Sequence, residues 1–297
     1  MHQPTPGLPE FDYVRPASLE EASRFLADHA GEARLFMGGT DTFVRMRDGV
    51  WQEKYVVDVK GLAGMNDISF DPQHGLTIGA AVNMNRVMAD EAVNKHYPLL
   101  AQAASTVASH QLRSRATIVG NICNASPAGD TIGACIVLEG VLQVHGLEGK
   151  REESLRGFFL SPGKTVLEAG DVVSALRLPI PPKGHAGRYV KLGRNASGDL
   201  AIVGVTALGF PDETAVSGFR FRLALASVAP TPFVPTMAEE ILANQPLTEV
   251  NVAAAAEAAQ ESVTPISDTR GGARYRKLMV RNLVKNAVTE VWQQLME

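Results

Sequence analysis

A proline cluster, Pro179-Ile-Pro-Pro182, divides this chain into two parts. Proline fixes φ and has no backbone N–H, so neither a helix nor a central strand can continue through the cluster. The segment that follows, Lys183-Gly-His-Ala-Gly187, has the composition of a linker. Because the chain has 297 residues, each part is long enough to bury a core of its own. We therefore expect one domain over residues 1–180 and a second over residues 187–297.

The first part alternates between helix and strand patterns. Ser18 and Glu21 form a capping box, and apolar residues repeat at helical spacing from there to Gly31. A short helix is predicted at residues 42–46, and longer ones at 83–93 and 98–109. Strands are predicted at residues 34–37, 55–59, 76–80, 136–144 and 172–178, with a charged turn at 148–153.

The second part places strands before helices, which predicts an α+β arrangement. Strand patterns lie around Tyr189, at 201–210 and at 219–228, and helical patterns follow at 235–244, 248–262 and 274–295. In the third strand, apolar residues alternate with two arginines and an alanine, namely Phe219, Phe221, Leu223 and Leu225 with Arg220, Arg222 and Ala224. This alternation is typical of an antiparallel strand with one face in water.

Composition excludes several classes of function. The net charge is −4 and the 28 basic residues are dispersed, which argues against a nucleic-acid or anionic membrane partner. No apolar run approaches the ~20 residues of a membrane span, and the start, MHQPTPGLPE, lacks the features of a signal peptide, so we expect a cytoplasmic protein. Two cysteines, Cys123 and Cys135, are too few for an iron-sulfur or zinc cage, and we assign no metal site.

A glycine turn, Gly38-Gly-Thr-Asp41, follows the predicted strand at 34–37. Consecutive backbone N–H groups with little side-chain bulk can hold phosphate oxygens, although a plain glycine turn explains the sequence as well. The G-x-G-x-x-G fingerprint of dinucleotide folds is absent here. A second glycine pair, Gly157 and Gly163, is followed by Lys164-Thr165, but five residues separate the glycines where a P-loop requires four.

A second segment of low bulk, from Arg115 to Ala134, reads RATIVGNICNASPAGDTIGA. Hydroxyl, amide and carboxylate groups lie along it with few side chains large enough to block a flat ligand. Two such segments in one domain favour a large phosphate-bearing cofactor over an irregular loop that its own polar side chains stabilise. Cys123 is interpreted as a packing residue and His110 as a surface or capping residue.

No catalytic constellation is present, since the chain contains neither G-x-S-x-G nor H-E-x-x-H. We therefore assign no catalytic residue.

Four motifs resemble the FAD-binding medium subunit of molybdenum hydroxylases, the type found in bacterial carbon monoxide, xanthine and nicotinate dehydrogenases. They are Phe36-Met-Gly-Gly-Thr-Asp41, Gln111-Leu-Arg-Ser-Arg-Ala-Thr-Ile-Val-Gly-Asn121, Ala125-Ser-Pro-Ala-Gly-Asp130 and Tyr189-Val-Lys191. Asp268-Thr-Arg-Gly-Gly-Ala-Arg-Tyr-Arg-Lys277 is similar to the C-terminal domain of that family, so the resemblance covers nearly the whole chain. It implies an FAD-binding domain of the p-cresol methylhydroxylase type, with two α/β subdomains at about 1–60 and 61–180, and then a smaller α+β domain.

The resemblance also implies a set of residues around a non-covalent FAD. A first loop from Leu35 to Thr42 would enclose the pyrophosphate, and Thr117 to Asn121, within the segment of low bulk, would form the second loop. Lys191 would lie near the isoalloxazine ring, where a cation could stabilise negative charge on the reduced flavin. The residues implied are Leu35, Phe36, Met37, Gly38, Gly39, Thr40, Asp41 and Thr42, then Ala108, Leu112, Thr117, Ile118, Val119, Gly120, Asn121, Asn124 and Asp130, and finally Lys164, Val173 and Lys191.

Three positions depart from the family pattern. Val119 stands where the family usually has a glycine, and its branched side chain is expected either to displace the backbone or to require a different turn. Ser114 replaces the usual asparagine after Arg113, and Gly193-Arg194-Asn195 replaces a pair of arginines. If the loop follows the family geometry, replacing Val119 with glycine should leave FAD affinity equal or improved.

By resemblance, the chain is an electron-transfer subunit, not a self-sufficient enzyme. FAD would take electrons from iron-sulfur clusters on a small two-cluster subunit and pass them to NAD or another acceptor, while substrate is oxidised on a large molybdopterin-binding subunit. The expected assembly is a dimer of heterotrimers, with molybdopterin and iron-sulfur clusters only on the partner subunits. Two alternatives stay open: a stand-alone flavin oxidase or dehydrogenase of the same fold, and an assembly subunit that has lost FAD.

Overall fold

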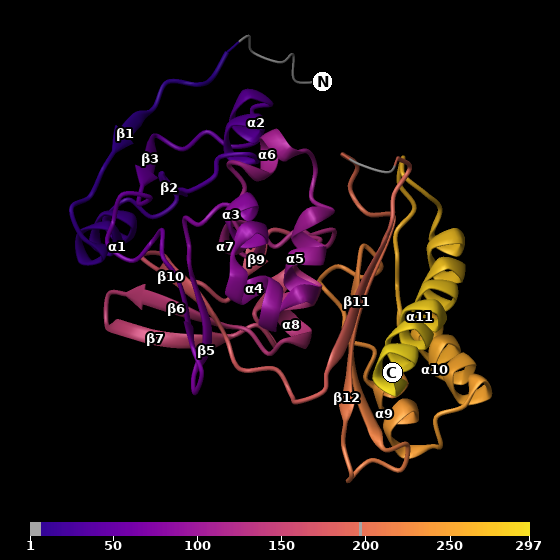
Figure 1. Ribbon diagram of the computed structural model, residues 1–297. Coiled ribbons are helices and arrows are strands. Elements are labelled where there is room, and N and C mark those ends of the chain that lie inside the picture. The colour runs from indigo at the N-terminus through magenta and orange to yellow at the C-terminus, as the bar shows by residue number, and fades with distance from the viewer. Residues whose placement is uncertain (1–6, 196–197) are drawn as a thin grey trace.

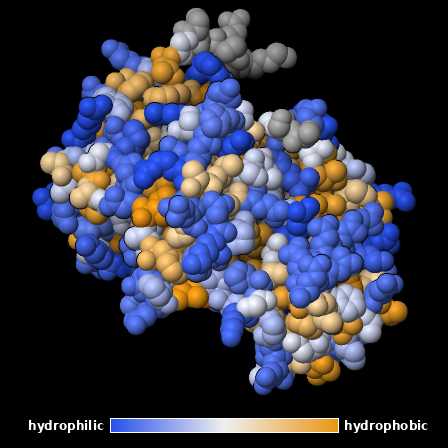
Figure 2. Space-filling model, viewed as in Figure 1, coloured by the Kyte–Doolittle hydropathy of each residue, from blue (hydrophilic) through white to orange (hydrophobic). Residues whose placement is uncertain are grey.

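The computed structural model describes residues 7–195 and 198–297. The first six residues of the start MHQPTPGLPE, for which no signal peptide was predicted, lie outside the described residues. Figure 1 shows two bodies side by side, an indigo-to-magenta one and an orange-to-yellow one, joined by the segment after β10. Figure 2 shows hydrophobic residues in small groups separated by hydrophilic ones over this face. Among the described residues, no helix is long and apolar enough to cross a membrane.

The amino-terminal part begins with a small parallel sheet in the order β1-β3-β2. Its strands are β1 (Asp12–Val14), β2 (Ala33–Phe36) and β3 (Tyr55–Asp58), and the helices are α1 (Leu19–Asp28) and α2 (Thr42–Arg47). The predicted capping box is confirmed: Ser18 Oγ accepts from the N–H of Glu21 at 3.1 Å, and Glu21 Oε2 accepts from the N–H of Ala17 at 2.7 Å.

An antiparallel five-stranded sheet follows, in the order β4-β5-β10-β6-β7. Its strands are β4 (Ile68–Asp71), β5 (Gly75–Gly79), β6 (Val141–Gly146), β7 (Gly149–Ser154) and β10 (Val172–Leu178), and a separate hairpin joins β8 (Phe159–Ser161) to β9 (Lys164–Thr165). The helices are α3 (Met84–Ala89), α4 (Glu91–His96), α5 (Pro98–Ser105), α6 (His110–Arg113), α7 (Ile118–Cys123) and α8 (Ile132–Val137). These helices and the sheet share one large buried core.

Several predictions in this part are wrong. The apolar run at 136–144 is not one strand, because α8 occupies its start and a left-handed residue, Glu139 at φ 58°, turns the chain before β6. The charged stretch 148–153 is not a turn but the edge strand β7, whose side chains face solvent.

The predicted helix 83–93 breaks at Asp90, whose carboxylate caps a new helix by accepting from the N–H of Val93 at 3.0 Å. The helix from Pro98 ends at Ser105 and not at residue 109. Strands β1, β4, β8 and β9 and the short helices α6 and α7 were not predicted.

The carboxyl-terminal part matches its prediction closely. Strands β11 (Ala186–Leu192), β12 (Val203–Pro211) and β13 (Phe219–Ala226) form an antiparallel sheet, followed by α9 (Thr236–Asn244), α10 (Glu249–Ser262) and α11 (Ala273–Met296). One face of the sheet packs against these helices in a second core. The prediction of α+β is confirmed for the whole chain, since both parts combine sheets with separate helices.

The second face of this sheet is not in water, contrary to the alternation of β13. It packs against α5 and α8 of the first part, as Figure 1 shows. Ala224 is 1% exposed, and the ion pair between Arg222 Nη2 and Glu139 Oε2 spans 3.0 Å between the two parts. Gly133 allows the close approach, because a Cβ there would overlap the Thr206 hydroxyl.

Candidate functional site

The two glycine-rich segments meet in the folded chain. Gly38 lies so close to the backbone of Arg115 that a Cβ at position 38 would overlap the Arg115 carbonyl oxygen. The chain after Arg115 is anchored in turn, since the carbonyl of Ala116 accepts from the N–H of Met84 at 2.8 Å. Glycine at position 38 is therefore required for contact between the segments, which lie far apart in sequence.

The first segment runs from the end of β2 into α2. Gly39 has φ 73°, in the left-handed region that favours glycine, and its Cα faces the Phe36 ring. Within residues 7–195 and 198–297, the N–H groups of Gly38, Gly39, Thr40 and Asp41 donate to no protein acceptor. Four consecutive free N–H groups beside a helix start give an anion-binding concavity.

The second segment begins with a capped helix start and is not an open loop. Thr117 Oγ1 accepts from the N–H of Gly120 at 2.9 Å and begins α7. In the described part of the chain, the N–H groups of Ile118 and Val119 have no protein acceptor. Val119 lies inside this helix with its side chain 3% exposed, in the main core, and its φ is not positive. The valine is therefore directed away from the free N–H groups, and this position has no conformational need for glycine.

Asp130 lies in a buried cluster that links the two parts of the chain. Its Oδ1 accepts from the Tyr189 hydroxyl at 2.6 Å, and its Oδ2 accepts from Lys191 Nζ at 2.7 Å. Lys191 Nζ also donates to the carbonyl of Thr106 at 3.0 Å. Burial raises the pKa of Asp130, opposed by Lys191 and Tyr189, and burial together with Asp130 raises the pKa of Tyr189 well above its ordinary value.

No basic residue lies close to Asp130 in the sequence. The partner comes from strand β11, which the sequence places 61 residues later. Sequence analysis did not single out Tyr189 as a site residue. A signal existed: residues two apart on a strand share a face, so Tyr189 must lie beside Lys191.

The remaining predicted residues lie at different depths. Ala108, in the turn between α5 and α6, has φ 41°, and Leu112 on α6 is 46% exposed. Asn121 Oδ1 accepts from Thr131 Oγ1 at 2.7 Å, and Asn124 ends α7.

Lys164 and Val173 are not joined to the glycine-rich segments by any hydrogen bond of the described residues. Lys164 is exposed on β9, and its hairpin is attached through the N–H of Gly163, which donates to the carbonyl of Ala125 at 3.1 Å. Val173 is buried in β10, a strand that contacts α7.

Neither cysteine is set up for reaction, because burial raises the pKa of the Cys123 and Cys135 thiols to about 12. This agrees with the interpretation of Cys123 as a packing residue. His110 is exposed at the start of α6, as expected of a surface residue. Over the ranges that the structure describes, no group of three or more His, Cys, Asp or Glu side chains could hold a metal ion.

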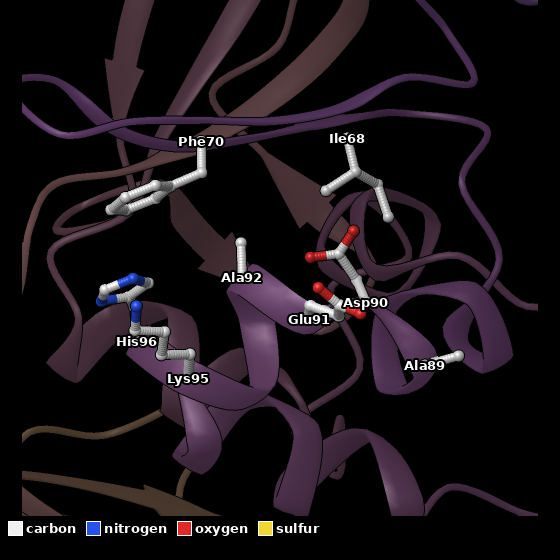
Figure 3. A pocket seen from close by; sticks show the side chains of 8 residues that line it. All are labelled: Ile68, Phe70, Ala89, Asp90, Glu91, Ala92, Lys95 and His96. Carbon is white, nitrogen blue, oxygen red and sulfur yellow. The ribbon is translucent and has the colours of Figure 1, made fainter.

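A surface hollow of about 620 Å³ lies elsewhere, between β4 and the junction of α3 with α4. Figure 3 shows the side chains that line it, namely Ile68, Phe70, Ala89, Asp90, Glu91, Ala92, Lys95 and His96. The Phe70 and His96 rings stack with centroids 4.3 Å apart at one side. The hollow shares no residue with the predicted site and is wide open to solvent, so we do not assign the function to it.

Two family models match the chain. Residues 9–181 match the FAD binding domain in molybdopterin dehydrogenase, and residues 188–291 match the CO dehydrogenase flavoprotein C-terminal domain. Among curated proteins, the carbon monoxide dehydrogenase medium chain of Hydrogenophaga pseudoflava is 31% identical over 284 residues, covering 96% of this chain and 98% of its own length. The xanthine dehydrogenase FAD-binding subunit of Escherichia coli O157:H7 is 30% identical over 279 residues, covering 94% of each chain.

Solved structures give the same result for the fold. A chain of carbon monoxide dehydrogenase from Hydrogenophaga pseudoflava superimposes with a TM-score of 0.92 at 32% identity, covering 97% of this chain and 99% of that one. A chain of quinoline 2-oxidoreductase from Pseudomonas putida 86 has a TM-score of 0.90 at 26% identity, covering 98% and 100%. The similarity therefore extends over both parts of the chain and over their arrangement.

Proposed function

This chain belongs to the FAD-binding medium subunits of the xanthine and carbon monoxide dehydrogenase family, and we propose that it carries electrons through a bound FAD within a molybdenum hydroxylase. In this proposal residues 1–180 form the FAD-binding domain, with subdomains of about 1–60 and 61–180, and residues 187–297 form the second flavoprotein domain. FAD accepts electrons from partner iron-sulfur clusters and passes them to NAD or another acceptor.

The observation that carries the proposal is the contact between the two glycine-rich segments. Gly38 brings the free N–H groups of residues 38–41 beside the segment that leads to the free N–H groups of Ile118 and Val119. A pyrophosphate carries two negative charges and needs several donors within a short span, which these groups provide. The residues present therefore fit the pyrophosphate of FAD.

The buried cluster around Asp130 fits the remainder of the cofactor. Asp130 has unused lone pairs beside its bonds to Tyr189 and Lys191, so it can accept from a hydroxyl of the ribityl chain or ribose. Lys191 supplies the one cation of this cluster, where it can stabilise negative charge on the reduced flavin. The carboxylate fixes the ammonium in place, and the low exposure of both groups strengthens their field.

We further propose an assembly of several subunits, as for relatives that are named medium chains or medium subunits. The partners are a large molybdopterin-binding subunit, where substrate is oxidised, and a small subunit with two iron-sulfur clusters, in a dimer of heterotrimers. Molybdopterin and the clusters reside on those partners, FAD is held without a covalent bond, and the complex works in the cytoplasm.

The test is purification of the chain from its native host, with a visible spectrum and a metal analysis of the material obtained. The expected result is a yellow complex that contains FAD, molybdenum and iron. Heat or acid should release the FAD, because no covalent link holds it. A colourless chain that takes up no added FAD would overturn the proposal, and a yellow chain that oxidises a substrate without partners would favour a stand-alone flavin enzyme.

A further inference from the structure

The turn that joins α5 to α6 is held by two cations through three consecutive carbonyls. Lys191 Nζ donates to the carbonyl of Thr106 at 3.0 Å, while Arg113 Nη1 donates to the carbonyls of Val107 at 2.7 Å and Ala108 at 3.4 Å. Charged donors to carbonyls form stronger hydrogen bonds than neutral ones. The turn is therefore fixed from the second part of the chain on one side and from α6 on the other.

The conformation of this turn is unfavourable for the residue that occupies it. Ala108 has φ 41°, in the left-handed region, although it carries a Cβ. Such a residue is retained only where its surroundings impose the conformation, and it occurs most often at binding and active sites. Arg113 provides the imposing contact, since the carbonyls of Val107 and Ala108 lie on both sides of the strained φ angle.

Two polar groups of this turn lack a protein partner. In the part of the chain that the structure describes, the N–H of Ala108 donates to no protein acceptor. The Nε atom of Arg113 is buried and also has no partner there. Ala108 is only partly buried, so Arg113 Nε is the decisive group: a buried donor without an acceptor is rare in folded proteins, and a bound ligand is one of the few explanations for it.

We propose that Arg113 is a positioning residue for the flavin: it holds Ala108 in the left-handed conformation, so that the turn is already shaped for FAD before FAD binds. The inference rests on the proposed function and on Ala108, which belongs to the residues that the family resemblance implies around FAD. Arg113 acts through the backbone of residues 107 and 108, and both bonds come from its Nη1 group. The two N–H directions of that group are fixed by the guanidinium plane, whereas the donors of a lysine ammonium rotate.

The test compares FAD dissociation constants of the full chain, measured by flavin fluorescence. Arg113→Met should weaken FAD binding by about five- to a hundredfold, because the strain at Ala108 then has to be overcome during binding. Arg113→Lys should give an intermediate loss. Arg86→Met, which removes an exposed arginine from neighbouring α3, is the matched control and should change the dissociation constant less than about twofold.

A second substitution separates positioning from a general structural role. Glycine adopts positive φ without strain, so Ala108→Gly should restore most of the affinity lost in Arg113→Met while changing the parent chain little. Equal affinity of Arg113→Met and the parent would overturn the inference, as would a double variant no better than Arg113→Met alone. If Arg113→Met does not fold, the same comparison is made with Arg113→Lys. Failure of the parent chain to bind FAD would instead count against the proposed function.

Discussion

Gly38 is the residue through which the two glycine-rich segments touch, so the first prediction concerns its missing side chain. Gly38→Ala places a methyl group on the carbonyl oxygen of Arg115. The atoms nearest to this methyl group belong to the backbone of Arg115 and Ala116, which cannot rotate away as a side chain can. We expect a loss of about 1–3 kcal/mol in the free energy of unfolding and a clearly weaker affinity for FAD. Urea unfolding and FAD titration measure the two effects.

The matched control for this prediction is Gly61→Ala. Gly61 has open space around its Cα and no positive φ, so the same methyl group should change neither stability nor FAD affinity by much. Equal behaviour of the two variants would show that the segments do not need the close approach at Gly38.

The sequence alone left open how Val119 affects the backbone of the second segment and the affinity for FAD. Its side chain is buried in the core and its backbone is helical, so Val119→Gly should lower stability by about 2–4 kcal/mol through lost burial and lost helix propensity. FAD affinity of the folded variant should stay within about twofold, because the free N–H groups remain in place. Val119→Ala, measured by the same urea unfolding and FAD titration, should fall between the variant and the parent. A large loss of FAD affinity at unchanged stability would contradict this account.

For single residues, the sequence predicted which residue types line the candidate site better than it predicted which side chains bond to one another. Hydroxyl, amide and carboxylate groups between Thr117 and Asp130 were visible as a set, but the bond from Asp130 to Lys191 was not. Such a contact depends on how two parts of the chain dock, and neither part encodes it by local pattern. The left-handed φ of Ala108 is equally invisible, since alanine gives no signal of positive φ.

At the scale of elements, α11 depends on a buried arginine near its start. Arg276 is 1% exposed, donates to the carbonyls of Ile202 and Ser227, and pairs with Asp268 through Nη2 at 2.6 Å. Asp268→Asn removes the opposing charge and should lower the free energy of unfolding at neutral pH by about 3–5 kcal/mol. The control is Asp212→Asn, which breaks an exposed pair with Arg220 and should cost much less.

The same pair predicts a pH dependence. Hydrogen bonds from Arg270 first, and then Arg276, hold the pKa of Asp268 well below its ordinary value of 3.8. A lowered pKa in the folded state means that the stabilisation is complete above the unfolded pKa and is lost as the pH falls towards the folded one. The stability difference between the parent and Asp268→Asn should therefore shrink as the pH falls below about 4. Urea unfolding at several pH values measures it, and a pH-independent difference would contradict the assignment.

Helices and strands were predicted correctly where the hydrophobic periodicity and the end signals agreed. The prediction failed where every residue of a segment is apolar, because such a segment shows no periodicity. The three C-terminal helices were found from their helical periodicity, and β10 from a short apolar run that ends at the proline cluster. The run at 136–144 is apolar throughout, so it cannot be divided by periodicity into the end of α8 and the start of β6. One face of β13 was predicted to be exposed to solvent because Arg220 and Arg222 lie on it. The same face also carries Ala224, which is buried where β13 packs against α8.

For the whole molecule, the docking of the two parts completes the candidate site. Strand β11 contributes Tyr189 and Lys191, and the first part contributes Asp130 and the carbonyl of Thr106. The N–H of Ser227 also donates to the carbonyl of Pro127 at 2.7 Å, three residues before Asp130. FAD affinity should therefore depend on the interface between the parts even where FAD itself touches only one of them.

Gly133 offers a way to disturb that interface without touching the site. A side chain there would meet Thr206 and Ala224 on the opposing sheet, so Gly133→Val should push α8 away from β12 and β13. The second core lies wholly in the carboxyl-terminal part, and the first core crosses the interface, among its described buried residues, only at Tyr189, Leu208 and Ala224. We therefore expect the two parts of the variant to unfold in separate transitions where the parent unfolds in one, with FAD bound about tenfold or more weakly. Calorimetry and FAD titration measure this, with Gly61→Val as the control for the added bulk. Retention of full FAD affinity alongside split transitions would show that the first part holds FAD alone, and Lys191 would then lose its proposed role.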